Sequence, residues 1–138
     1  MKRNKIIFWT ATIFLFLFEG IMPSTALLFA PSSATAGTIY LQYPEYFAYV
    51  IIAFKVTGSI LLLIPGLPRP IKEWTYAGFG FNFICATISH VVVDGPGILS
   101  FFPLVILGIA IVSYVTYFKV YGHDRILIKQ YMTALQTH

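Results

Sequence analysis

Two ionisable side chains of opposite charge interrupt the apolar runs of this sequence. Glu19 lies nine residues before the end of the apolar run 6–28, and Lys55 lies nine residues after the start of the run 46–64. At 1.5 Å per helical residue, each is about 13.5 Å from its end, so two consecutive antiparallel helices place them at equal depth. A lone charge at that depth in a bilayer is costly, whereas a facing pair can share a proton or form an ion pair. We therefore expect Glu19 and Lys55 to face each other.

Pro23 follows Glu19 by four residues, which is one helical turn. Because proline has no N–H, Pro23 cannot donate the helical hydrogen bond to the Glu19 carbonyl. The sequence therefore predicts a kink and a polar pocket around this carboxylate. Two interpretations of the charged pair stay open. It fixes the register of two helices, or it belongs to a functional site, which is the default expectation for ionisable groups inside a bilayer.

The run 74–93 carries the remaining polar candidates. His90 precedes Asp94 by four residues, so on a helix the carboxylate would orient the imidazole. This pair is either a proton-accepting site at the outer mouth of the pocket or a hydrogen-bonded histidine at a helix end. Asn82 and Ser89 share a helical face with small residues, which is typical of close helix packing: Gly78, Cys85 and Ala86. The candidate pocket residues are therefore Glu19, Lys55, Asn82, Ser89, His90 and Asp94.

The remaining reactive residue types are too few or too dispersed for other chemistry. Cys85 is the single cysteine, so the chain can form no internal disulfide or CxxC pair. His123 and His138 lie far from His90 in the predicted topology, and we expect no metal or haem site from one chain. The Lys and Arg residues stand in short flanks between apolar runs, so we also expect no nucleic-acid partner.

The elements that must position these side chains are transmembrane helices. Of 138 residues, 58% are hydrophobic and 10% are charged, against roughly 25% charged in a soluble domain. Four apolar runs approach the roughly 20 residues that a spanning helix requires: about 6–28, 46–64, 74–93 and 99–121. Breaks at 31–37, 65–70 and 94–97 separate them. The sequence predicts an all-α membrane protein, a single domain over 1–138 built as a four-transmembrane-helix bundle.

Charge asymmetry predicts the orientation of the helices. Eight of the nine Lys and Arg residues fall before the first run, between the second and third, or at and after the end of the fourth. The positive-inside rule then places both termini in the cytoplasm. Arg69 and Lys72 would anchor the cytoplasmic side, and Tyr40 and Tyr43 would lie at the outer interface.

The two ends of the chain carry further predictions. After a break at Gly122, residues 123–137 are predicted to form a short amphipathic helix on the membrane surface, with Asp124 as its cap. At the other end, a basic start, an apolar run and the sequence Ala34-Thr35-Ala36 are similar to a secretory signal. We favour a membrane span, because the run is long and is interrupted by Glu19.

Several short motifs along the chain form a pattern: Tyr43-Pro44, Lys55-x-x-Gly58, Leu63-Ile64-Pro65, the run 72–79 (KEWTYAGF) and Ser89-His90. With these residues the chain resembles the bacterial DoxX-like family of small four-helix membrane proteins. The resemblance covers nearly the whole chain, and the run 72–78 with Ser89-His90 is its most specific part. Asn82 departs from the family pattern, in which an Asp is common, and an amide does not exchange protons at ordinary pH.

The resemblance implies a four-helix bundle in the cytoplasmic membrane. The founder of the family is a subunit of a thiosulfate:quinone oxidoreductase, and the wider group includes an animal chaperone for receptor assembly. We therefore expect a polar pocket that binds a quinone or another lipophilic molecule, in a subunit of a redox complex. Two alternatives stay open: an assembly or chaperone-like protein that contacts a membrane partner or a second copy, and a small proton-coupled carrier. Whether the chain is an enzyme is left open by its residues.

Overall fold

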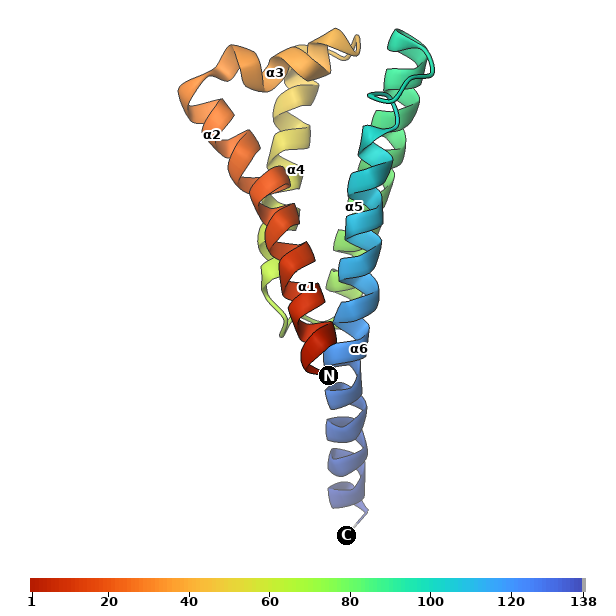
Figure 1. The fold of residues 1–138 in the computed structure, drawn as a ribbon. Helices are drawn as coiled ribbons and strands as arrows, with labels where there is room; N and C mark the ends of the chain where they lie inside the picture. The colour runs from red at the N-terminus through yellow and green to blue at the C-terminus, as the bar shows by residue number, and fades with distance from the viewer. Residues whose placement is uncertain (138) are drawn as a thin grey trace.

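The described part of the chain consists of helices joined by short connections (Figure 1). The computed structural model describes residues 1–137, except for the side chains of residues 123–125. No strand occurs in this described part. The elements, in chain order, are α1 (Lys2–Leu15), the π-helical turn η1 (Phe16–Ile21), α2 (Met22–Phe29), α3 (Pro31–Tyr40), α4 (Glu45–Leu63), α5 (Arg69–Asp94) and α6 (Phe102–Gln136).

The four predicted spans are confirmed, with shifted ends. Four helical stretches are long and apolar enough to cross a membrane, and the first of them runs unbroken through α1, η1 and α2. The third begins earlier than predicted, because Pro68 and Pro70 form its start, where a missing N–H costs nothing. It ends at Gly95, whose positive φ of 80° suits glycine.

The long helices are arranged as two arms (Figure 1). The first span and α4 form one arm, and α5 and α6 form the other. The arms meet where α1 contacts α6, near the N-terminus, and diverge toward the opposite end, where α3 crosses from α2 to α4. We call these the N-terminal end and the α3 end. The arms are therefore farthest apart at the α3 end.

An apolar core joins the two arms, and a buried set of three hydroxyl groups lies within it. The apolar residues include Leu15 and Leu62 from one arm and Phe79 and Ile106 from the other. Ser113 of α6 lies 2.8 Å from the Thr12 hydroxyl and 2.8 Å from the Tyr76 hydroxyl. Hydroxyl contacts of this kind join helices where lipid offers no alternative partner. They hold α1, α5 and α6 together below the divergence.

Two segments differ from the sequence predictions. Residues 31–37, predicted as a break between spans, belong to α3, because Pro31 is favourable at the first position of a helix and ends α2 only locally. The predicted separate helix at 123–137 is also wrong: α6 continues through Gly122 to Gln136. One glycine inside a helix costs only about 1 kcal/mol, and the flanking residues favour helix. The predicted cap, Asp124, has a side chain outside the described part.

Lys72 is buried, although the sequence predicted an exposed anchor. Its Nζ donates hydrogen bonds to the carbonyl oxygens of Leu61 and Leu62, at 2.8 and 2.7 Å, and lies 4.9 Å from the centre of the Tyr117 ring. These carbonyls belong to the last turn of α4, where the intrahelical donors run out and the helix dipole is negative. Lys72 therefore closes the end of α4 from the neighbouring helix.

We expect Lys72→Met to lower the free energy of unfolding by about 2 kcal/mol, because two charge-assisted hydrogen bonds are lost and two carbonyls remain buried. The measurement is unfolding in mixed detergent micelles, followed by circular dichroism. Lys119→Met is the control, since Lys119 is exposed. Equal stability of the two variants would contradict the role assigned to Lys72.

Candidate functional site

The predicted ion pair is present. Lys55 Nζ lies 3.0 Å from Glu19 Oε2, and the side chains of Lys55 and Glu19 are 27% and 2% exposed. The two residues come from consecutive antiparallel helices, as their equal depth in the sequence predicted. The carboxylate is thus nearly sealed from the surroundings, and the ammonium group reaches it from the more open side.

A π-helical turn positions the carboxylate. Glu19 lies in η1, and the N–H of Met22, the residue that follows the turn, donates to the carbonyl of Leu17, five residues earlier. The sequence predicted a kink at Pro23. In the structure the irregular part of the helix is this wider turn, which lies just before Pro23. The Ser24 hydroxyl donates to the Gly20 carbonyl at 2.6 Å. A side-chain donor therefore supplements the backbone bonds beside the ion pair.

Helix α4 packs directly on this turn. A Cβ added at Gly20 would overlap the hydroxyl of Ser59, which is fully buried. Ser59 follows Lys55 by one helical turn, so Lys55 and Ser59 share a face and meet the neighbouring residues Glu19 and Gly20. Glycine at position 20 thus sets the separation of the helices that brings the two charges together.

The carboxylate is not saturated by its partner. Oε2 of Glu19 is buried and has no hydrogen-bond partner within the described part of the chain, although Lys55 Nζ is 3.0 Å away. Lys55 Nζ and Glu19 Oε2 therefore form an ion pair whose angles are not those of a hydrogen bond. A buried oxygen without such a bond is costly, so Oε2 can accept one from a molecule bound beside it.

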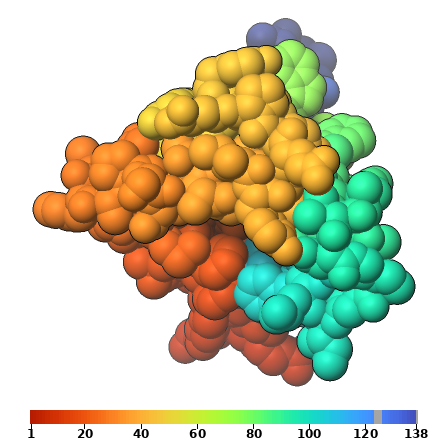
Figure 2. Space-filling model, turned by 90° about the horizontal axis from the view of Figure 1, so that it is seen from above, coloured from red at the N-terminus to blue at the C-terminus, as the bar shows by residue number. Residues whose placement is uncertain are grey.

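That oxygen belongs to a residue that lines a cavity of about 820 Å³ at the α3 end. Five of the six predicted pocket residues line this cavity: Glu19, Lys55, Asn82, Ser89 and His90. Its other walls include several aromatic side chains, among them Phe18, Phe47, Phe81 and Phe102. In the space-filling view from this end, α3 and the turn after it lie over the middle of the molecule and meet the connection between α5 and α6 (Figure 2).

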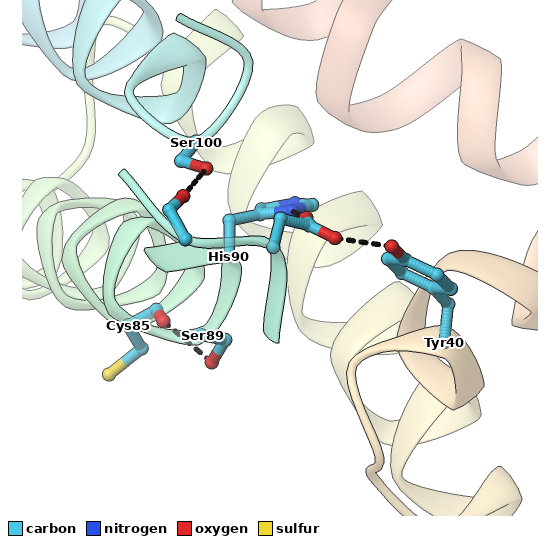
Figure 3. Close-up of polar contacts among 7 residues, drawn as sticks. Tyr40, Cys85, Ser89, His90 and Ser100 are labelled. Carbon is cyan, nitrogen blue, oxygen red and sulfur yellow. Dashed lines mark hydrogen bonds and ion pairs between the residues drawn. The ribbon is translucent and has the colours of Figure 1, made fainter. Parts of the chain in front are cut away.

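Asp94, the sixth predicted residue, is absent from the lining and instead holds two lining residues. His90 Nδ1 lies 3.0 Å from Asp94 Oδ2, which confirms the predicted pair. Tyr40, at the end of α3, points toward the same carboxylate and donates its hydroxyl proton to Oδ1 (Figure 3). This hydrogen bond to Asp94 raises the pKa of Tyr40 above its ordinary value. Tyr40 therefore remains a protonated donor that ties α3 to α5.

A second tyrosine forms a parallel connection. The hydroxyls of Tyr43 and Ser89 lie 2.8 Å apart, and Ser89 donates to the Cys85 carbonyl. Because the single proton of Ser89 is used there, Tyr43 is the donor. Sequence reasoning placed Tyr40 and Tyr43 at the membrane interface and missed these contacts. The only signal was their position three residues apart between two spans, which does not reveal a partner 46 or 54 residues away.

The small residues Gly78, Cys85 and Ala86 of α5 were predicted to pack closely against another helix. Cys85 and Ala86 line the cavity, and a Cβ added at Gly78 would meet no atom within 4 Å. Close helix packing at Gly78 is therefore wrong, because the two arms diverge and leave this face of α5 open. Within the described residues, no group of three or more His, Cys, Asp or Glu could hold a metal ion.

Comparison with known proteins identifies the family of the chain. The sequence profile of the DoxX-like family matches residues 7–113, which is well over half of the chain and includes both members of the ion pair. No curated protein and no solved structure matches. The chain therefore belongs to the DoxX-like family and is a membrane protein with apolar spanning helices.

We expect a double-mutant cycle to show that the two charges interact. Glu19→Gln and Lys55→Met should each destabilise the protein, and the double variant should lose at least about 1 kcal/mol less than the sum of the single losses. Each single change leaves one charge without its partner, and the double change removes both. Unfolding in mixed micelles gives the three differences. Additive losses would show that the charges do not stabilise each other.

We also expect Gly20→Ala to cost about 2 kcal/mol, because the added methyl group must displace α4 at Ser59. Gly108→Ala is the matched control. Gly108 lies in α6 with no atom near an added Cβ, so alanine there should raise stability by up to about 1 kcal/mol. The unfolding midpoints of both variants provide the test. A stabilising Gly20→Ala would refute the close approach.

Proposed function

We propose that this membrane protein binds a lipophilic small molecule with a polar ring, such as a quinone, in the cavity at the α3 end, and serves as a subunit of a redox complex. The observation that carries the proposal is the buried oxygen Oε2 of Glu19, which has no hydrogen-bond partner among the described residues, on a side chain that lines a cavity with several aromatic walls. Such a combination suits a ligand that is apolar over most of its surface and polar at one or two atoms.

The size and walls of the cavity support a ligand of this class. Small-molecule sites occupy about 300–1,000 Å³ and are mostly apolar, with a few convergent polar groups. The cavity, at about 820 Å³, falls in that range. Its phenylalanine rings can stack on a planar ring. A strongly hydrated ligand would have to leave water for these walls at a high cost.

The polar groups are suited to both redox forms of a quinone. The ammonium group of Lys55 has three N–H donors and can donate to a quinone carbonyl oxygen. Oε2 of Glu19 can accept from the hydroxyl of the reduced form. His90, oriented by Asp94, offers a ring nitrogen on the other arm. The chain thus binds and orients the ring, and a partner protein would supply or receive the electrons.

We also propose an orientation. The Lys and Arg residues other than Lys55 gather toward the N-terminal end, which the positive-inside rule places in the cytoplasm. The cavity would then open toward the outer side of the cytoplasmic membrane. A ligand in this cavity would exchange protons with that side.

One observation favours assembly as a second candidate function. Helix α6 extends beyond the other helices at the N-terminal end (Figure 1), and its last turns expose Leu127, Tyr131 and Leu135. An apolar exposed extension of this kind can contact the helix of a membrane partner. In this alternative the α3-end cavity would have a structural role only.

We expect the purified protein to retain one molecule of a decyl-substituted benzoquinone in native mass spectrometry. The double variant Glu19→Gln/Lys55→Met should reduce the bound fraction at least about tenfold, equivalent to about 1.4 kcal/mol. The double change avoids leaving one charge unpaired, and Lys119→Met is the control that removes a charge outside the cavity. Equal retention by wild type and double variant, or no retention by either, would contradict the proposal. Recovery of a protein instead of the quinone would favour assembly.

A further inference from the structure

A second hollow lies between α4 and α5, on the outside of the molecule. This α4–α5 groove has a volume of about 530 Å³, and its walls include Phe54 and Leu61 from α4 and Ile71 and Trp74 from α5. Phe54 and Trp74 are 75% and 77% exposed. Because both helices are membrane-spanning, these side chains and the groove between them face the lipid chains.

The groove and the cavity share part of their walls. Ile51, Lys55 and Asn82 line both. Lys55 and Asn82 therefore lie at the junction where the groove meets the cavity. The residues farther along the groove are mainly apolar. From Ile51 to Leu61 the groove follows ten residues of α4, about 15 Å at 1.5 Å per residue. Polarity therefore falls along the groove from the junction toward the N-terminal end.

Two glycines give the groove its depth. A Cβ at Gly58 would come within 3.0 Å of the Phe79 ring, so glycine is needed where α5 approaches α4. At Gly78 the space is open, and no side chain fills it. The groove is therefore tightly packed at Gly58 and open at Gly78. An elongated apolar chain can bind in the open part.

We infer that the α4–α5 groove holds the apolar chain of the molecule whose polar ring occupies the α3-end cavity. This inference rests on the proposed function and narrows its ligand class to amphipathic molecules: a polar ring at Lys55 and Asn82, and a hydrocarbon chain along Leu61, Ile71 and Trp74. Such a ligand reaches the site sideways from the bilayer and keeps its chain in apolar surroundings throughout. A ring without a chain fills the cavity alone.

The test is photolabelling of the full-length protein with a benzoquinone whose ten-carbon chain ends in a diazirine. We expect the label on the groove residues of α4 or α5, and we expect an excess of the chainless benzoquinone to displace it. Gly78→Leu should reduce this labelling at least tenfold, because the space beside Gly78, where an added Cβ would meet no atom within 4 Å, would then hold the leucine side chain. Gly108→Leu, on an equally open site of α6, should label like the wild type.

The outcomes separate this inference from the proposed function. Displaceable label that maps to α3 or to residues 99–106 would leave the cavity as a quinone site and overturn the groove assignment. Groove label that the chainless quinone does not displace would show that the groove accepts any chain, including that of a bilayer lipid, and would also overturn it. The absence of any label in the cavity or in the groove would overturn both.

Discussion

The cost of a carboxylate in hydrocarbon is the constraint on which this structure depends. Glu19 is almost fully enclosed, so its charge needs a partner within reach. Lys55 provides that partner only because Gly20 lets α4 approach the π-helical turn at Ser59. The ion pair, the turn and the close helix contact are therefore one arrangement. The same arrangement leaves one carboxylate oxygen without a hydrogen bond beside a cavity, which is the feature that makes this end of the molecule a binding site in our proposal.

The two ends of the molecule satisfy their polar groups in different ways. At the N-terminal end, Lys72 closes the last turn of α4, and the hydroxyl groups of Thr12, Tyr76 and Ser113 are paired inside the core. At the α3 end the arms diverge, and α3 is tied across them by Tyr40. The closed end gives rigidity, and the open end provides space. A binding site placed at the open end can exchange ligand without disturbing the core.

The proposed ligand follows from the junction of two hollows. A cavity with polar groups alone would suit many small molecules. An apolar groove alone would suit any lipid chain. Lys55 and Asn82 line both the cavity and the groove. In our proposal the combined site therefore selects a molecule with a polar ring at one end and an apolar chain at the other. In this proposal the ion pair has two roles: it joins two helices, and it lies where the polar ring and the apolar chain of one ligand would meet.

The sequence by itself determined the four spanning helices, the Glu19–Lys55 pair and the His90–Asp94 pair. The spans follow from the length of the apolar runs, and the His90–Asp94 pair follows from the spacing of one helical turn. The Glu19–Lys55 pair follows from the equal depth of the two residues, calculated from the rise of about 1.5 Å per helical residue. Only the tertiary structure decided that Lys72 is buried, that Tyr40 and Tyr43 bind α5, and that Gly78 faces open space. These features depend on the angle between the two arms. That angle results from contacts between residues far apart in the chain, and no local pattern encodes it.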